Sequence, residues 1–233
     1  MKIHPSHLQL THYCEGALDD VNGFTISLHL EQCSECKAKA SELEARCANL
    51  LFEADFAHST DNNDSKALDN MLDAITAIES SLEARQSPLL TEESNEQATI
   101  STPNGKTFVL PRILSRHVER ISDWKSYGGK VYSAAIDLDT QARVNLLYIN
   151  EDAQVPQHTH KGEETTVILH GGFSDEDGHY HAGDFLTRDT SHKHAPFTQA
   201  GEDCLCLTVL TEPMIFTQGV ARIFNLFGKG MYP

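Results

Sequence analysis

One segment in the second half of the chain constrains the fold more than any other feature. His158 and His160 are two residues apart, and Glu164 follows them with the same parity. On a β-strand, residues two apart lie on the same face, so these side chains can point to one side of a sheet. Imidazole and carboxylate groups together suit a divalent first-row metal ion. The segment therefore predicts a metal site inside a β-structure.

The sequence around this segment has the pattern of short strands. Apolar and β-branched residues are concentrated at 131–136, 144–149, 165–169 and 205–210, and glycine-containing turns lie between them. Many short strands at close spacing are typical of a sandwich or barrel. We therefore expect residues 105–233 to form an all-β domain.

The first part of the chain has the period of helices instead. We expect four helices: one that begins near Pro5 and ends at Gly16, a second over 21–30, a third that opens at the cysteines and runs towards Phe52, and a fourth between Asp64 and Ser87. In the fourth, apolar residues recur every three or four positions, as on one face of a helix. Residues 1–86 are therefore predicted to form a four-helix domain.

A polar stretch that contains proline separates the two parts. Residues 87–104 have the composition of an interdomain linker. The chain has 233 residues, of which 39% are hydrophobic, so it has room for two domains and can bury a packed core. The sequence predicts a two-domain α + β protein, helical over 1–86 and all-β over 105–233.

A second group of candidate metal ligands lies in the helical part. If the segment is helical, His29, Cys33 and Cys36 share one helix face. Three nitrogen and sulfur ligands in so short a segment are typical of tetrahedral zinc, which needs one more ligand from elsewhere. A redox Cys-x-x-Cys is the alternative, but its βαβ context is missing here. The spacing leaves the fourth ligand open among His4, His7, His12 and Cys14.

This helical part resembles the zinc-binding anti-sigma domain. The resemblance rests on His-x-x-x-Cys-x-x-Cys at the junction of two helices, after a short first helix that carries a histidine. Such domains hold an extracytoplasmic-function sigma factor inactive by occupying its RNA-polymerase-binding surfaces. The resemblance implies a histidine near the first helix as the fourth zinc ligand. The register of Thr11 to Gly16 selects His4, with His7 as the second choice.

The β part resembles the cupin barrel, which is a double-stranded β-helix. The residues from His158 to Glu164, followed by Gly171, reproduce the first cupin motif, and Gly183-Asp184 with a distal histidine resembles the second. The resemblance implies a divalent ion, with zinc expected first and manganese, iron or nickel as alternatives. The implied ligands are His158, His160, Glu164 and His194, and His192 competes with His194 for the last place.

Other reactive residues near these motifs are expected to have no ligand role. Glu163 has the opposite parity to Glu164 and should face outward, and the cysteines at 204 and 206 are expected to be buried strand thiols. Three further histidines are expected on the surface, namely His170, His179 and His181.

The combination of both parts resembles the ChrR-type anti-sigma factors over nearly the whole chain. The resemblance implies a transcriptional regulator that sequesters an extracytoplasmic-function sigma factor. It also implies that the cupin domain is needed to release the sigma factor under oxidative stress, notably singlet oxygen. No catalytic residues are expected in such a protein. A cupin dioxygenase or isomerase with an accessory helical domain is the alternative, and a passive binding barrel is a third possibility.

Charge and hydropathy indicate which class of partner the protein binds. The first 100 residues carry 18 acidic and 6 basic side chains. This balance disfavours a nucleic acid partner and suits a basic protein. No stretch approaches the roughly 20 consecutive apolar residues of a membrane span, and the first ten residues do not resemble a secretory signal. We expect a soluble cytoplasmic protein that contacts neither nucleic acid nor membrane directly.

Overall fold

The computed structural model describes residues 2–58, 69–74, 97–219, 221–222 and 225, and for residues 51–58 it describes the backbone alone. The chain divides into two compact units. One unit joins Met1–Ser41 to Gln97–Pro233, and the other is Glu42–Glu96. Among the described residues, no helix is long and apolar enough to cross a membrane.

The first two helices begin at residues that cap them. Helix α1 (His7–Cys14) starts after Ser6, whose hydroxyl accepts a hydrogen bond from the backbone N–H of Gln9, while the Gln9 side chain accepts one from the Ser6 N–H. Helix α2 (Asp20–Gln32) starts after Asp19, whose carboxylate accepts a hydrogen bond from the backbone N–H of Asn22. Each cap satisfies N–H groups that have no partner within the helix. Both predicted helices are confirmed.

A break at one cysteine separates α2 from helix α3 (Ser34–His58). Cys33 has extended backbone angles, with φ −125° and ψ 99°, so the helix stops there and a new one starts at the next residue. The predicted third helix is confirmed. Within the predicted fourth helix, residues 69–74 are helical, and its remaining part lies outside the described residues.

The C-terminal part is built from strands, as expected. All four strands predicted from the sequence are present, as β4, β5, β7 and β11. The described strands are β1 (Thr99–Ser101), β2 (Thr107–Val109), β3 (Lys125–Tyr127), β4 (Val131–Ile136), β5 (Arg143–Ile149), β6 (His158–His160), β7 (Glu164–Ser174), β8 (His179–His181), β9 (Phe185–Arg188), β10 (Lys193–His194), β11 (Cys204–Leu210) and β12 (Met214–Phe216). Two short helical turns, α5 (Arg112–Ser115) and η1 (Val118–Arg120), lie between β2 and β3. Strand pairing starts at Thr99, within the stretch expected to be linker.

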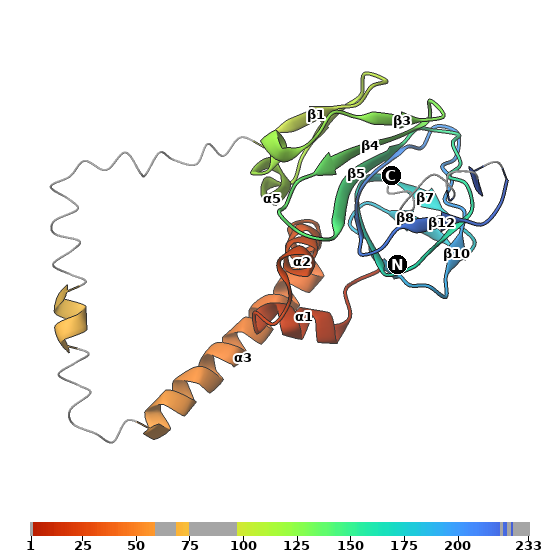
Figure 1. Ribbon diagram of the computed structural model, residues 1–233. Helices are drawn as coiled ribbons and strands as arrows, with labels where there is room; N and C mark the ends of the chain where they lie inside the picture. The colour runs from red at the N-terminus through yellow and green to blue at the C-terminus, as the bar shows by residue number, and fades with distance from the viewer. Residues whose placement is uncertain (1, 59–68, 75–96, 220, 223–224, 226–233) are drawn as a thin grey trace, which may run out of the picture. The chain divides into compact units, whose positions relative to one another are not determined.

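The strands form two main sheets around one interior (Figure 1). The large sheet has the order β3-β4-β5-β11-β7-β8, with β9 also paired to β7, and the small sheet has the order β10-β6-β12. Strand β11 pairs with β5 on one side and β7 on the other, and all seven of its residues are buried. Burial of each large aliphatic side chain on such a strand contributes about 1.5–3 kcal/mol. The fold is thus a helical N-terminal region followed by a cupin-like β-structure.

The segment before α1 is attached to the barrel by hydrogen bonds that the backbone of Ile3 makes. The Ile3 N–H donates to Asp184 Oδ1 at 2.9 Å, and the Ile3 carbonyl accepts from the Phe185 N–H at 2.9 Å. The other carboxylate oxygen of Asp184 accepts from the His181 N–H at 2.8 Å. Gly183 precedes it with φ +90°, a conformation that suits glycine. The turn between β8 and β9 therefore fixes the position of Ile3 on the barrel.

Helix α2 also contacts the barrel domain. The Glu31 carboxylate accepts hydrogen bonds from the backbone N–H groups of Arg112 at 2.8 Å and Ile113 at 2.9 Å, at the start of α5. Two residues earlier on the same helix, the His29 ring packs edge-on against the Phe185 ring, with their centroids 5.7 Å apart. The segment before α1 and helix α2 are therefore docked on the barrel.

We expect Asp184→Ala to lower the free energy of unfolding by about 1–3 kcal/mol, because it removes the acceptor for two N–H groups, those of Ile3 and His181. Urea unfolding followed by circular dichroism measures this change. The matched control is Asp139→Asn, which removes an exposed ion pair to Arg120 at a left-handed position that asparagine tolerates, and it should cost less than about 1 kcal/mol. Equal losses in the two variants would contradict the structural role of Asp184.

Candidate metal centres

The first cluster joins residues from three separate segments of the helical region. His4, His29, Cys33 and Cys36 place their ligand-type atoms within 4.8 Å of one another. His4 Nδ1 lies 3.4 Å from Cys33 Sγ and 3.2 Å from Cys36 Sγ. The four residues singled out in the sequence are therefore brought together, and they provide the two-histidine, two-cysteine set that is common in structural zinc sites.

Local structure explains why these four side chains meet. His4 follows Ile3, which the barrel holds, and precedes the buried Pro5. His29 lies in the last turn of α2, Cys33 is at the helix break, and Cys36 is in the first turn of α3. His29, Cys33 and Cys36 therefore do not lie on one continuous helix, because the chain breaks at Cys33 between α2 and α3. This arrangement lets both thiols face His4.

Burial sets the electrostatics of this cluster. Burial, and next the nearby His4, lower the pKa of His29 to about 4, so its ring is neutral at pH 7 and can offer a lone pair. Burial and the neighbouring Cys33 raise the pKa of the Cys36 thiol to about 11. Among the described residues, neither ring nitrogen of His29 has a hydrogen-bond partner, although the ring is fully buried. A divalent cation would satisfy that ring and favour the thiolates, so the cluster fits a zinc site.

The other candidates for the fourth ligand lie outside the cluster. His7 is exposed, and its Nδ1 lies 3.3 Å from Thr11 Oγ1. The Cys14 thiol donates to the Ala40 carbonyl at 3.4 Å. His12 is not among the four clustered residues either. The geometry therefore favours His4 over His7.

The second cluster lies inside the barrel. His158 and His160 come from β6, Glu164 starts β7, and His194 is on β10 directly opposite His158. Their ligand-type atoms also lie within 4.8 Å of one another, and all four residues are buried. His160 Nε2 is 3.2 Å from both His194 Nε2 and Glu164 Oε2. Three imidazoles and one carboxylate are thus grouped together, a donor set that suits a divalent first-row metal.

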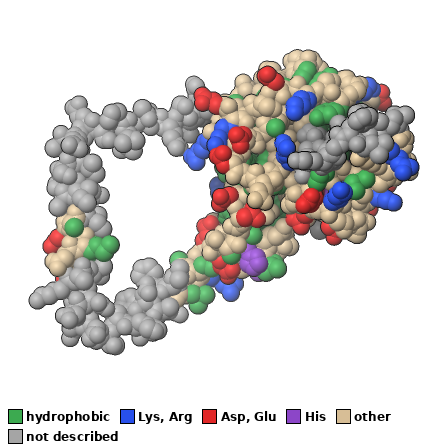
Figure 2. Space-filling view, in the orientation of Figure 1, with side chains coloured by type: hydrophobic (Ala, Val, Ile, Leu, Met, Phe, Trp, Pro, Cys, Tyr) green, Lys and Arg blue, Asp and Glu red, His purple; other side chains and the backbone are tan. Residues whose placement is uncertain are grey.

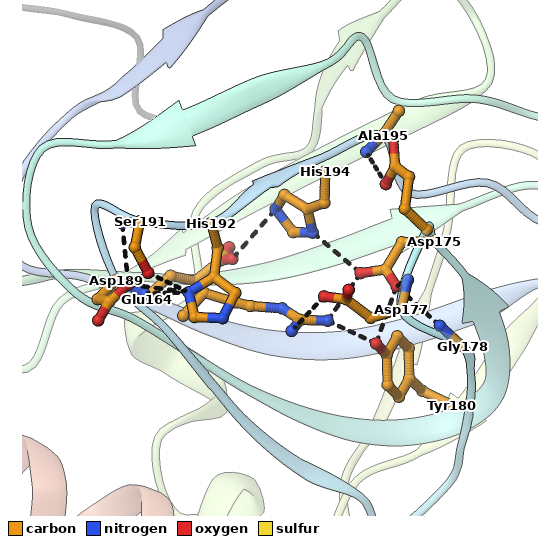
Figure 3. A network of polar contacts seen from close by, with 12 residues as sticks. Glu164, Asp175, Asp177, Gly178, Tyr180, Asp189, Ser191, His192, His194 and Ala195 are labelled. Carbon is orange, nitrogen blue, oxygen red and sulfur yellow. Dashed lines mark hydrogen bonds and ion pairs between the residues drawn. The ribbon is translucent and has the colours of Figure 1, made fainter.

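Hydrogen bonds on the outer side orient two of these imidazoles. His158 Nδ1 donates to the Pro156 carbonyl at 2.8 Å, because a carbonyl oxygen can only accept. His194 Nδ1 lies 3.2 Å from Asp175 Oδ2. In both rings Nε2 is then left with its lone pair, and in His194 that atom faces Glu164 (Figure 3). A carboxylate that orients a ligand histidine in this way is common in metal sites.

Asp175 is itself held firmly. Its Oδ1 accepts from the Tyr180 hydroxyl at 2.8 Å (Figure 3). Its Oδ2 accepts from Arg188 Nη2 at 2.8 Å. Burial alone would raise the pKa of Asp175, but hydrogen bonds from His194 and Tyr180 outweigh it, so the pKa lies below its usual range. Asp175 carries no signal in the sequence, since an aspartate in a turn resembles many others.

Burial also shifts the ligand-type groups of the second cluster. Burial and the neighbouring His194 lower the pKa of His158 to about 4, and burial with the two other histidines lowers that of His160 to about 3. Burial raises the pKa of Glu164. Among the described residues, His160 Nδ1 has no hydrogen-bond partner. A neutral imidazole can donate a lone pair to a metal ion. A divalent cation would also supply the positive charge that the buried Glu164 carboxylate needs.

Several neighbouring residues lie where the sequence placed them. Glu163 is exposed, and so are His170, His179 and His181. Cys204 and Cys206 are buried on β11. His192, the competitor of His194, is bonded through Nδ1 to Asp189 Oδ1 at 2.8 Å and lies outside the cluster.

The structure also gathers an exposed group that the sequence did not indicate. His179, His181 and Glu202 place their ligand-type atoms within 4.8 Å of one another. His179 Nε2 lies 3.3 Å from Glu202 Oε1. The two histidines share one strand, but Glu202 is far from them along the chain, which is why spacing alone could not reveal the group.

A cavity of about 580 Å³ adjoins the second cluster. Three of the four clustered residues form part of its wall, namely His158, Glu164 and His194. The rest of the wall is mainly apolar.

We expect Asp175→Asn to weaken metal binding at the second cluster by about 10–100-fold, because the amide cannot stabilise the His194 Nδ1–H as a carboxylate does. Competition with a chromogenic chelator measures the affinity. The control is Asp177→Asn, an exposed residue that bonds the same Arg188 but not His194. Identical affinities in both variants would exclude the orienting role.

Comparison with known proteins supports the interpretation of both parts. Residues 121–213 match a family model described as the ChrR Cupin-like domain. The chain is 27% identical over 228 residues to the anti-sigma-E factor ChrR of Cereibacter sphaeroides, which covers 97% of this chain and 98% of that protein.

A solved structure shows the same likeness. The crystal structure of Rhodobacter sphaeroides SigE in complex with the anti-sigma ChrR matches with a TM-score of 0.63 and 28% sequence identity. The match covers 90% of this chain and 98% of that chain. The chain is therefore similar to ChrR-type anti-sigma factors along nearly its whole length, and its residues 121–213 match the ChrR cupin-like domain.

Proposed function

We propose that this protein is an anti-sigma factor that holds an extracytoplasmic-function sigma factor inactive and releases it on oxidative stress of the singlet-oxygen type. One observation carries the proposal. A chain that matches ChrR over 97% of its length also assembles two separate ligand clusters, one in each part. The ChrR of the matching crystal structure is bound to SigE. The proposed partner is accordingly a sigma factor rather than nucleic acid or a membrane.

The helical region is the proposed sigma-binding part. We assign this role to residues 1–86, with 87–104 as the linker and 105–233 as the cupin domain; the end of the linker forms β1, which pairs with β2 of that domain. Zinc bound by His4, His29, Cys33 and Cys36 would tie the segment before α1 to the junction of α2 and α3. Small domains held together by such ligands commonly lose their fold without the metal.

The surface of the helical region suits a basic partner. The first 100 residues carry 18 acidic and 6 basic side chains. The exposed part of α3 has both signs, with Glu35, Glu42 and Glu44 beside Lys37, Lys39 and Arg46, and Figure 2 shows acidic and basic side chains on the face in view. Complementary charge increases the rate and specificity of encounter more than the affinity. Leu8 on α1 is 63% exposed and offers an apolar contact. These features support binding to a basic protein surface that also has apolar positions.

The cupin cluster is the proposed sensor, and contacts connect it to the zinc-type cluster. His194 contacts Asp175, and Asp175 contacts Arg188 at the end of β9. The first residue of β9, Phe185, contacts both Ile3 and the His29 ring. A change at the cupin metal can therefore reach the sigma-binding helices through one strand. Zinc is the first choice of metal at this cluster.

We place the protein in the cytoplasm. None of the six cysteines, all of which lie in the described residues, forms a disulfide. Thiols persist in a reducing compartment, where they can serve as metal ligands.

The cavity beside the cupin cluster supports a second candidate function, a metal-dependent dioxygenase or isomerase. We favour regulation because the likeness to ChrR covers both parts of the chain. An enzyme would lose turnover when the cupin ligands are removed and would show no change in sigma release.

We expect the double variant Cys33→Ser and Cys36→Ser to lose the N-terminal zinc and to lose inhibition of the sigma factor, because two remaining ligands cannot hold the helices together. Metal analysis of the purified protein and sigma-dependent transcription in vitro measure the two effects. Cys47→Ser is the control, since this cysteine lies on α3 outside the cluster. Full zinc content in the double variant would contradict the assignment.

We expect the double variant His160→Ala and Glu164→Ala to lose the cupin metal, to retain basal inhibition and to stop responding to singlet oxygen. The ligands belong to the barrel, so the zinc-type cluster keeps its own residues. The measurement is sigma-dependent transcription with and without singlet oxygen, with metal analysis of the same preparation. His192→Ala serves as the control. Normal induction in a double variant that lacks the second metal would rule out the sensing role.

A further inference from the structure

An exposed group of two histidines and one glutamate lies on the barrel, apart from both buried clusters. His179 and His181 are the two ends of β8, the last strand in the order of the large sheet (Figure 1), and Glu202 lies in the loop before β11. Their ligand-type atoms lie within 4.8 Å of one another, and none of the three residues belongs to a buried cluster. Two imidazoles and one carboxylate form a donor set that divalent first-row metals accept.

Strand β8 presents both imidazoles on one face. Residues two apart on a strand point to the same side, so His179 and His181 face one way and Tyr180 faces the other. Tyr180 is buried, packs on the Phe173 ring with centroids 5.1 Å apart, and donates its hydroxyl hydrogen bond to Asp175. This buried side chain anchors the strand. The two imidazole rings are exposed and in contact, with centroids 4.3 Å apart.

A glycine gives the Glu202 carboxylate room beside these rings. Gly172 on β7 pairs in register with His181. A Cβ atom at position 172 would lie 3.1 Å from Glu202 Oε1 and would overlap the Tyr180 carbonyl oxygen, so any side chain there would crowd both groups. The Gly172 N–H donates to the Asp203 carbonyl at 3.1 Å, which fixes the residue after Glu202. The backbone thus brings Glu202 against β8.

The polar contacts of His179 leave one ring nitrogen for a cation. Its Nδ1 lies 2.7 Å from the Ser174 hydroxyl oxygen, and its Nε2 lies 3.3 Å from Glu202 Oε1. When Nδ1 donates to the hydroxyl, Nε2 keeps a lone pair that faces the carboxylate, as in metal sites whose outer hydrogen bonds orient the histidines. With bonds of about 2.0–2.1 Å to the metal, the ligand atoms of a tetrahedral zinc site lie about 3.4 Å apart. The 3.3 Å between His179 Nε2 and Glu202 Oε1 matches this separation.

A hydrogen bond between His179 and Glu202 is the alternative explanation of this contact. That bond would involve only two of the three groups, and the His181 ring would have no part in it. A cation binds all three groups at once, and it offsets the charge of the carboxylate in a chain whose net charge is −16. Because all three residues reach solvent, water can fill the remaining coordination positions. The arrangement therefore favours a cation.

We propose that His179, His181 and Glu202 form a third metal site, which binds one divalent first-row cation of the zinc, nickel and copper class. Magnesium does not compete for this site, because hard cations prefer ligand sets made of oxygen atoms. The site is exposed, so it exchanges its ion more readily than the buried clusters do. It shares no residue with them, and it requires no assumption about a sigma factor.

Equilibrium dialysis of the full chain over a series of micromolar free zinc concentrations tests the site, with zinc per chain measured by mass spectrometry. The unchanged protein should bind one zinc ion more weakly than the others. His181→Gln and Glu202→Gln should each weaken the binding of that ion at least about tenfold, because one ligand is lost. Circular dichroism shows whether each variant is folded. An unchanged affinity in either folded variant would overturn the proposal.

The matched control is His170→Gln. This histidine is also exposed on the large sheet, and its Nε2 lies 3.7 Å from Asp203 Oδ1, but it lies outside the group. The variant should bind all zinc ions as the unchanged protein does. Loss of the weakest ion in His170→Gln, to the same extent as in His181→Gln, would show general binding to surface histidines and would overturn the proposal.

Nuclear magnetic resonance of the histidine rings locates the ion. Zinc added after the tighter sites are filled should shift the ring signals of His179 and His181 and leave those of the buried clusters unchanged. An excess of magnesium should not reverse these shifts. Shifts confined to other histidines, or reversal by magnesium, would contradict the assignment.

Discussion

The arrangement of the compact unit formed by Met1–Ser41 and Gln97–Pro233 depends on the contact between the Ile3 backbone and the Asp184–Phe185 segment. This contact holds the residue before His4 against the barrel, and His4 completes the zinc-type cluster with residues of α2 and α3. The metal-binding geometry of the helical region is therefore fixed partly by the cupin domain. Because a backbone N–H and a backbone carbonyl make this contact, nearly any side chain at position 3 could preserve it.

Desolvation has the same consequence in both clusters. Burial lowers the pKa of His29, His158 and His160, so all three rings are neutral near pH 7. Neutral rings are the form that binds metal, and their depressed pKa values mean that protons compete with the metal only at acidic pH. The clusters differ in what surrounds them: the first has thiols at a helix break, whereas the second has an oriented carboxylate–histidine pair and an adjoining cavity.

Much of this arrangement could be predicted from the sequence because it is encoded locally. Strands β4, β5 and β11 have continuous runs of apolar residues, and the helix ends have recognisable capping residues. Both ligand sets follow from motif spacing. Asp175 could not be predicted, because its role depends on meeting His194 across the fold. The pairing of the buried Asn145 and Thr208 also escaped prediction, since strand register, rather than spacing along the chain, brings these residues together.

The shared carboxylate of Asp184 makes docking of the helical region observable. One oxygen protects the amide hydrogen of Ile3, and the other protects that of His181, while the Phe185 amide bonds the Ile3 carbonyl. Departure of the helices would expose the amides of Ile3 and Phe185 to solvent, yet β11 would keep both of its neighbouring strands. Amide hydrogen exchange therefore distinguishes undocking of the helices from opening of the barrel, residue by residue and in the intact protein.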